Sequence, residues 1–230
     1  MIESATGLVL RTRLLTETSL IVHWLTRDSG RIATVAKGAR GPKSPFRGKL
    51  DLFYLADFSF SRSRHSELHA LREVSLRETH SFFRQELGYL QQASYCAMLA
   101  EQTTETDTPL PAIFELMSGF LQALPQSEPH PKTVLAFELK LLSQLGLKPD
   151  LAQSRLTAGA KEIVRRFGQD DWGSISRLKP STTQLTDLRQ FLHGFLTYHL
   201  GKVPKGRGTV LEVQDPITLR EPHRPVNFSA

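Results

Sequence analysis

The spacing of the apolar residues changes once along this chain, near Thr79, and that change limits the folds the chain can adopt. Before this point apolar and polar residues alternate, most clearly over residues 51–61, which is the pattern of half-buried strands. After it, apolar residues recur at intervals of three and four, which is the pattern of amphipathic helices. Strands followed by helices indicate an α+β protein. We predict a β-rich domain over residues 1–79 and a mainly α-helical domain over residues 80–230.

The β-rich segment contains five candidate strands. The second and third flank Asp28-Ser29-Gly30, whose residues favour tight turns, so these two strands form a predicted hairpin. A long connection, residues 38–49, follows the third strand. The OB-fold is the commonest five-stranded barrel of this size and often binds oligonucleotides, so we predict an OB-fold β-barrel by analogy. The strands are expected at residues 7–13, 20–26, 31–37, 51–61 and 68–76.

Proline and glycine mark the ends of the predicted helices, because proline suits the first helical position and glycine the position after the last. Thr79 or Ser81 is expected to cap a first helix whose apolar positions continue to residue 98. The tail from Lys202 is expected to be loop-like. The other predicted boundaries are helix starts at Pro111 and Pro131, helix ends at Gly146 and Gly201, and helices over residues 160–167 and 182–200.

Positive charge is concentrated around the long connection. Residues 27–49 contain seven Lys/Arg and a single acid, Asp28, a net charge of +6 that equals the formal charge of the whole chain. A cationic loop beside a curved sheet can follow a phosphate backbone, and release of counterions then makes the binding sensitive to salt. The alternative is a solvated loop with no ligand. A nucleotide-binding P-loop is disfavoured, because Pro42 separates Gly41 from Lys43 and removes an amide.

Aromatic residues cluster in the same segment. They could stack on bases, but a small barrel needs large side chains for its core, and we favour the core for most of them. These residues are Phe46, Phe53, Tyr54, Phe58 and Phe60.

Nothing in the sequence points to an enzyme, a cofactor or a metal. Cys96 is the only cysteine, which excludes an internal disulfide and a cysteine-based zinc site and fits a reducing cytoplasm. The histidines and acids form no metal-binding or catalytic motif. The N-terminus shows no signal peptide, and no apolar run approaches the ~18 residues of a spanning helix. We expect a cytoplasmic, non-enzymatic protein with no membrane partner.

Three groups of residues, in order along the chain, resemble the RecO family of bacterial recombination mediators. The first resembles the opening of that family, the second its central helix and the exit from it, and the third its last helix and the basic stretch that follows. They are Gly7-Leu8-Val9-Leu10-Arg11-Thr12-Arg13 with Glu17 to Val22, Val35 to Arg40 and Phe46 to Leu50; Phe137 to Leu142 with Leu145 to Leu147 and Pro149 to Leu151; and Tyr198 to Gly201 with Lys205 to Arg207.

The resemblance implies an N-terminal OB-fold joined to a helical domain, and a protein that binds single- and double-stranded DNA. It implies annealing of complementary strands without ATP, and action with RecR to load RecA onto DNA covered by single-strand-binding protein. It also implies that the helical domain contacts the C-terminal tail of that protein, and a place in the bacterial cytoplasm, at the nucleoid during repair.

The chain departs from the family pattern in two places. Many relatives carry a four-cysteine zinc module after the central helix, but Ser154 and Thr157 stand where its first pair would fall, so we expect a metal-free remnant at about residues 150–180. Ala136 stands where the family pattern has Arg, which moves the expected contact with the acidic tail to neighbouring residues. These are Lys132, Phe137, Lys140 and Leu141.

The hypothesis is therefore a DNA-binding recombination mediator with no catalytic residue. Two alternatives stay open, an RNA-binding OB-fold protein and a helical protein-interaction scaffold. The cations expected to bind DNA phosphates are Arg11, Arg27, Arg31, Lys37, Arg40, Lys43, Arg47 and Lys49, with Lys205 and Arg207 extending the path.

Overall fold

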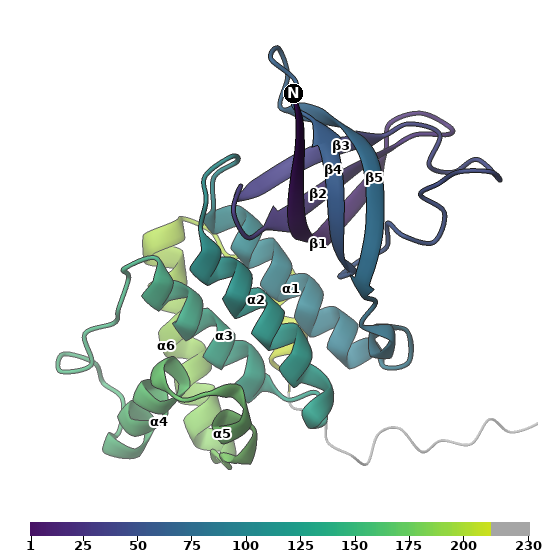
Figure 1. Ribbon diagram of the computed structural model, residues 1–230. Coiled ribbons are helices and arrows are strands. Elements are labelled where there is room, and N and C mark those ends of the chain that lie inside the picture. Colours follow the sequence, from purple (N-terminus) through teal and green to yellow (C-terminus); the bar gives the residue numbers. More distant parts are fainter. Residues whose placement is uncertain (213–230) are drawn as a thin grey trace, which may run out of the picture.

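A computed structural model describes residues 1–212, and residues 213–230, the end of the predicted helical domain, lie outside that description. The described chain forms a β-barrel that sits on a group of helices (Figure 1). The last strand ends at Glu78 and the first helical turn begins at Ser81. The change in apolar spacing near Thr79 thus marks the passage from strands to helices, and the α+β prediction is confirmed.

Five strands close into a barrel in the order β1-β2-β3-β5-β4, as predicted for the OB-fold. Neighbouring strands are antiparallel except β3 and β5, which run parallel and complete the closure. The strands are β1 (Ile2–Leu14), β2 (Leu20–Thr26), β3 (Arg31–Ala36), β4 (Leu55–Ser61) and β5 (Leu68–Glu78).

Strand β1 is longer than predicted because it serves two neighbours. Its first part, from Ile2 to Leu8, pairs with β4, and the part from Gly7 onward pairs with β2. A bulge between Val9 and Arg11 lies within the pairing with β2, just after the pairing with β4 ends, and bends the strand there. Residues 2–6 are mostly polar, so they carry no hydrophobic alternation and gave no strand signal.

The barrel is filled by aromatic and β-branched side chains. Trp24 stacks on Phe58 with their ring centroids 4.1 Å apart, and its indole Nε1 donates to Thr34 Oγ1 at 2.8 Å. That bond satisfies the one polar group that the indole brings into the core. The preference for core over base stacking is confirmed, because Phe46, Phe53, Tyr54, Phe58 and Phe60 are all buried.

The helices follow the proline and glycine signals closely. Gly146, at φ +75°, ends α3 in a Schellman motif in which Leu147 N donates to Leu142 O and Gly146 N to Ser143 O. The helical segments are the 3₁₀ turn η1 (Ser81–Arg84), α1 (Leu87–Thr103), α2 (Pro111–Ala123), the 3₁₀ turn η2 (Leu124–Gln126), α3 (Pro131–Gln144), α4 (Ala158–Gln169), α5 (Trp172–Arg177), α6 (Thr182–Leu200) and α7 (Arg207–Val210).

Three predictions about local structure were wrong, and one of them is the strand expected from residue 51, because β4 begins only at Leu55. The chain leaves the barrel through His80, which is left-handed at φ 45°, into η1, and α1 starts only at Leu87 because Glu86 has an extended backbone that separates the two. Glu86 caps α1 through its side chain, which accepts from Gly88 N. The tail from Lys202 is not wholly a loop, since it contains α7.

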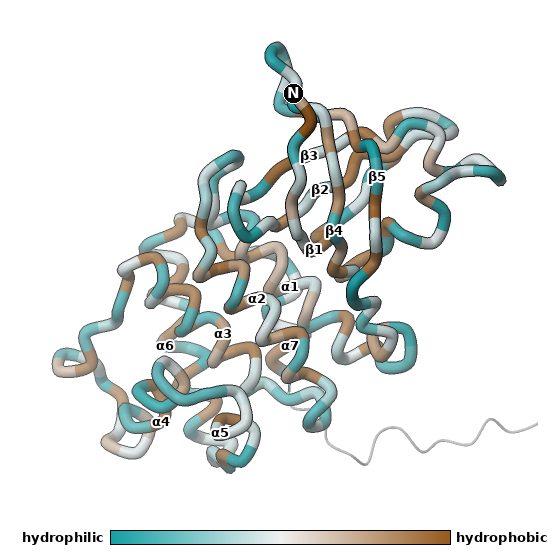
Figure 2. Tube along the Cα trace, in the orientation of Figure 1, coloured by the Kyte–Doolittle hydropathy of each residue, from teal (hydrophilic) through white to brown (hydrophobic). Residues whose placement is uncertain are grey.

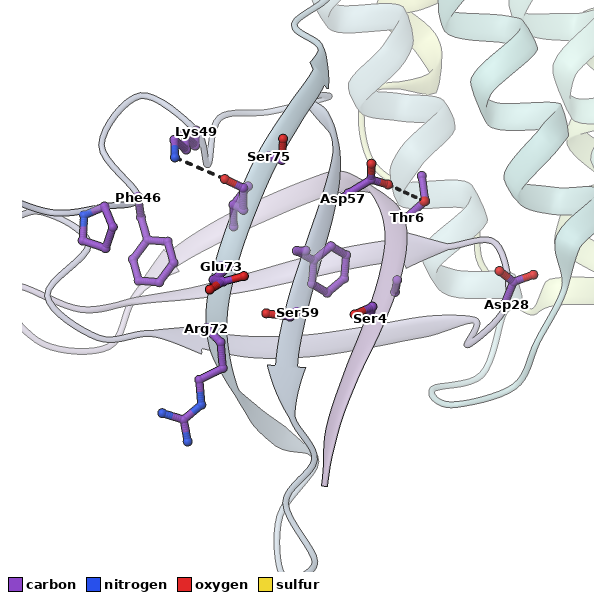
Figure 3. A pocket seen from close by; sticks show the side chains of 14 residues that line it. Ser4, Thr6, Asp28, Phe46, Lys49, Asp57, Ser59, Arg72, Glu73 and Ser75 are labelled. Carbon is purple, nitrogen blue, oxygen red and sulfur yellow. Dashed lines mark hydrogen bonds between the residues drawn. The ribbon is translucent and has the colours of Figure 1, made fainter.

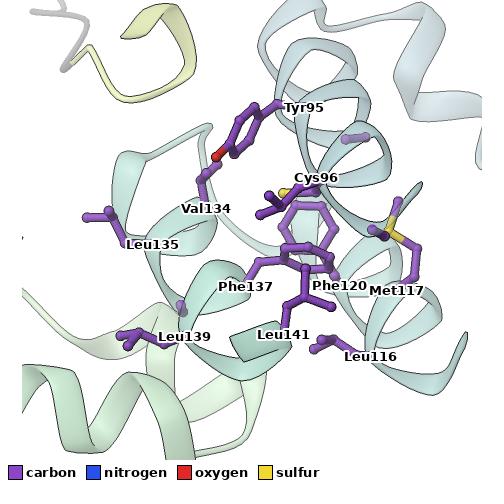
Figure 4. Packing of buried hydrophobic residues seen from close by; sticks show 14 of the residues in the cluster. Tyr95, Cys96, Leu116, Met117, Phe120, Val134, Leu135, Phe137, Leu139 and Leu141 are labelled. Carbon is purple, nitrogen blue, oxygen red and sulfur yellow. The ribbon is translucent and has the colours of Figure 1, made fainter. Parts of the chain in front are cut away.

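The helices and the outer wall of the barrel share one apolar core. Leu8, Leu10 and Leu25 point away from the barrel interior and join the buried cluster of α1, α2 and α3. Figure 4 shows the centre of that cluster, where Phe120 of α2 meets Phe137 of α3. Apolar and polar residues are interspersed along the strands and helices, because most of these elements bury one side and expose the other (Figure 2).

The expected remnant of the zinc module forms α4 and α5, which pack on α2 and α3. Thr157, which stands where the resemblance led us to expect a cysteine in relatives, caps α4 by accepting from Ala160 N. Trp172 begins α5 and its ring lies 5.6 Å from that of Phe120. Across residues 1–212 there is no group of three or more His, Cys, Asp or Glu side chains placed to hold a metal ion.

Candidate nucleic-acid interface

The long connection between β3 and β4 is a compact series of turns. Successive bonds from Gly41 N to Gly38 O, Ser44 N to Gly41 O and Arg47 N to Ser44 O fold it tightly. Phe46 is buried and packs with the barrel core, which fixes the middle of the loop. Four of its cations remain exposed to solvent, and we call them the basic loop. They are Lys37, Arg40, Lys43 and Arg47.

Lys49 differs from these four cations. It is only partly exposed, and its Nζ donates to Val74 O on β5 at 3.2 Å. This contact ties the end of the loop to the barrel.

The basic loop lies beside the turn between β1 and β2. Arg40 N donates to Thr18 O at 3.0 Å, and its guanidinium donates to Glu17 O at 2.9 Å. This turn leads directly into the outer face of β1, β2 and β3, where Arg13 stands opposite Ile21 and Arg11 opposite His23. The loop therefore stands at one end of a barrel face that carries two further arginines.

A cavity of about 480 Å³ lies farther along this face, and we call it the groove. In OB-folds the face of strands 2 and 3 and the loops beside it are the usual oligonucleotide site. The groove is bounded by β1, β2 and β3, by the β4–β5 loop and by the end of α1. Its lining includes Arg11, His23, Arg31, Ala33, Ser66, Glu67, Leu68, Glu101 and Thr106.

His23 reports the electrostatic character of the groove. Burial, together with the positive charges of Arg11, Arg13 and Arg31, lowers its pKa from the ordinary 6.5 to about 4. Burial, the larger cause, disfavours any charge at this position, whereas the three arginines repel a cation and would attract an anion. Sequence reasoning did not select His23 or Arg13, because their proximity depends on the pairing of β1 with β2. A known strand register would have been needed to find them.

Three predicted phosphate ligands also hold the barrel against the helices. Arg11 Nε lies 3.0 Å from Glu101 Oε1 on α1, and Arg27 Nη2 lies 3.0 Å from Glu115 Oε1 on α2. Arg31 donates twice to Thr104 O, at 2.5 and 3.2 Å. Arg11 and Arg31 nevertheless line the groove, whereas Arg27 lies outside its lining.

The prediction that Arg207 binds DNA is corrected by its position. Its side chain is buried and pairs with Glu138 of α3, so it has no free face for a phosphate. Lys205, two residues earlier, is exposed. Of the two cations predicted to bind DNA after α6, Arg207 is buried and only Lys205 is exposed to solvent.

The predicted contact for an acidic tail is wrong in its apolar members. Phe137 and Leu141 are buried in the helical core and present no surface. Lys132 Nζ donates to Ser176 O and Leu178 O, and Lys140 Nζ donates to Asp170 O. These lysines hold α5 and its neighbouring loops against α3. The four residues were expected from the resemblance around Ala136, but this part of α3 faces the helical core and α5.

A larger cavity, of about 630 Å³, lies over β1, β4 and β5 (Figure 3). Its charged lining residues are three acids and two bases, and Asp57 accepts a hydrogen bond from Thr6 Oγ1 at 2.6 Å. An excess of carboxylates repels a phosphate backbone. The smaller groove is lined by two arginines and two glutamates and has no such excess of acids, so it is the better nucleic-acid candidate of the two. The acids are Asp28, Asp57 and Glu73, and the bases are Lys49 and Arg72.

The closed five-stranded barrel, with a helical unit against its wall, defines an OB-fold protein, and its basic loop and groove are a candidate site for a polyanionic ligand. The family model "Recombination protein O N terminal" matches residues 1–80, and the model "Recombination protein O C terminal" matches residues 84–157. The chain belongs to the RecO family of DNA repair and recombination proteins.

Curated relatives support this assignment. A protein named DNA repair protein RecO in Bacillus pumilus is 30% identical over 229 residues, which span 94% of this chain and 87% of the relative. Proteins of the same name are 33% identical in Anaeromyxobacter sp. (strain K), over 74% of this chain and 67% of the relative, and in Exiguobacterium sibiricum, over 77% and 70%. Among the described helices, none has the length and apolar character to span a membrane.

Proposed function

We propose that this chain binds DNA along the basic loop and the groove and acts in DNA repair as a recombination mediator. The observation that carries the proposal is that four exposed loop cations lie next to a barrel face that carries further arginines. The bonds of Arg40 to residues 17 and 18 hold the loop against this face. Neutralised phosphates release counterions, which supplies affinity without base specificity. The same contacts serve single- and double-stranded DNA.

Annealing on this surface requires no catalytic residue. Two complementary strands repel one another through their phosphates, and bound cations reduce that repulsion so that bases can pair. The protein would act by charge and position alone, without ATP, cofactor or metal. Its proposed partners are RecR, the C-terminal tail of single-strand-binding protein and, indirectly, RecA. We propose that it works in the bacterial cytoplasm, at the nucleoid during repair.

An annealing assay tests the proposal. Two complementary oligonucleotides coated with single-strand-binding protein are mixed without ATP, and duplex formation is followed with and without this protein. We expect acceleration that fades as salt rises. The triple variant Arg40→Ala, Lys43→Ala, Arg47→Ala should lose most of it. The matched control is Lys148→Ala, Arg155→Ala, Lys179→Ala, which removes the same charge from exposed positions on the helical unit. Equal loss in both variants would contradict the proposed site.

Two alternatives give different results. An RNA-binding protein would prefer an RNA oligonucleotide over DNA of the same sequence in a competition experiment. A helical scaffold would bind neither at low salt. The concentration of cations on one barrel face favours the DNA-binding mediator over the scaffold.

A further inference from the structure

The stretch from α6 to α7 is basic and carries an exposed aromatic side chain. Residues 188–211 contain no acid and four Lys/Arg residues, of which Lys202 and Lys205 are exposed. Tyr198, near the end of α6, is 85% exposed, and no other aromatic residue of the described chain is among the large apolar side chains open to solvent. A tyrosine ring left this open has an apolar face available for a ligand.

Neighbouring rings support Tyr198. Its ring packs edge-on against His199 with the centroids 5.0 Å apart, and His199 lies 4.3 Å from Phe195. Phe195 in turn packs against the helical core. The chain of contacts connects the exposed ring to the interior and limits its freedom before any ligand binds, which reduces the entropy lost on binding.

This surface is continuous with the groove across the last turn of α1. Glu101, which lines the groove, is the ion-pair partner of Arg11. The next residue, Gln102, donates through Nε2 to Lys202 O at 2.7 Å. The segment of Lys202 is therefore held against the same helix turn that bounds the groove, and Tyr198 lies four residues before Lys202 in the sequence.

We propose that Tyr198 is a base-stacking platform for single-stranded DNA leaving the groove, with Lys202 and Lys205 contacting the adjacent phosphates. The inference rests on the proposed function and extends it by a second contact. A single strand is the fitting occupant, because its bases are free to stack on an aromatic ring, whereas duplex bases are already stacked on one another. The absence of acids between residues 188 and 211 suits a polyanion.

Oligonucleotide length separates the platform from the groove. An oligonucleotide of about 8 nucleotides lies within the range of one OB-fold site, and one of about 25 nucleotides exceeds it. The affinity of the full chain is measured for both, and for a duplex, by fluorescence anisotropy. Tyr198→Ala should weaken binding of the long single strand by about fivefold or more, the loss expected for one stacked base. It should leave the short strand and the duplex unchanged.

Two further variants sharpen the test. Tyr198→Phe keeps the ring and should restore full affinity. His193→Ala changes an exposed residue on another side of the same helix and should have no effect. A fluorescent base analogue scanned along the long strand should be quenched at one position outside the groove, and this quenching should disappear in Tyr198→Ala.

The outcomes are distinct. An unchanged affinity of Tyr198→Ala for the long strand, with quenching retained, overturns the platform. Equal weakening for short and long strands also overturns it, because the ring would then act within or through the groove. If the basic-loop triple variant leaves all binding unchanged, the proposed function fails whatever Tyr198 does.

Discussion

Arg207 and Glu138 form a buried two-point ion pair between segments 69 residues apart in the sequence. Arg207 Nε lies 2.7 Å from Glu138 Oε1, and Nη2 lies 2.8 Å from Oε2. The Tyr95 hydroxyl donates to the same carboxylate at 2.5 Å. The pair fastens α7 to α3, so the basic stretch after α6 is held by an arginine that cannot bind DNA itself.

Replacing Arg207 should destabilise the fold more than it changes DNA binding. Arg207→Ala leaves the Glu138 carboxylate buried without its cation, which costs about 3–5 kcal/mol in the free energy of unfolding. Urea denaturation measures this. Lys205→Ala, an exposed neighbour, should stay within about 0.5 kcal/mol of the unsubstituted chain. A loss for Arg207→Ala below about 1 kcal/mol would mean that water reaches the carboxylate.

Neutralising Glu101, one of the two acids that line the groove, should strengthen DNA binding. Glu101 competes with phosphate for Arg11, so Glu101→Gln frees a cation and raises the groove charge by one. We expect affinity for a short single strand to rise about two- to fivefold at low salt and the gain to shrink as salt increases. Glu115→Gln frees Arg27 outside the groove and is the control. An equal gain from both changes would indicate net charge alone.

Neutralising the basic loop should flatten the salt dependence of binding. Each phosphate contact on a single strand contributes about 0.7 to the slope of log K against log salt, so losing three contacts lowers the slope by about 2. The measurement is a titration of the Arg40, Lys43, Arg47 triple variant at several salt concentrations. The Lys148, Arg155, Lys179 triple variant should keep a slope closer to that of the unsubstituted chain.

His23 should make stability depend on pH below neutrality. Its pKa is about 4 in the folded chain and ordinarily 6.5, so the unfolded chain takes up the proton more readily between these values. The penalty is absent above about pH 6.5 and grows as the pH falls toward 4. His23→Gln should therefore lose less stability than the unsubstituted chain between pH 7.5 and pH 5, measured by urea midpoints. His65→Gln, at an exposed loop position, should behave like the unsubstituted chain.

Local signals predicted most of the fold. Pro111, Pro131 and Gly146 lie where helix ends require them, and the range 182–200 matches α6. The signals failed where a distant partner decides the structure. Residues 2–6 become strand because β4 is available to pair with them, and His80 turns left-handed where the chain leaves the barrel.

The candidate site was predictable in part for the same reason. The basic loop is contiguous in the sequence, so its charge could be counted there. The groove depends on strand register, which brings Arg11 and Arg13 to His23. Arg207 was predicted wrongly for a different reason. A basic residue in a glycine-rich segment is expected to be exposed, and its burial becomes evident only when its partner Glu138 is known.

The outer side of the barrel contacts the helices through Leu8, Leu10 and Leu25, and this contact limits whether the barrel can exist without the helices. Many small barrels work as interchangeable modules. Without its helices, this barrel would expose an apolar surface patch and would tend to aggregate. Recombination between genes could therefore transplant the pair as a unit far more readily than the barrel alone.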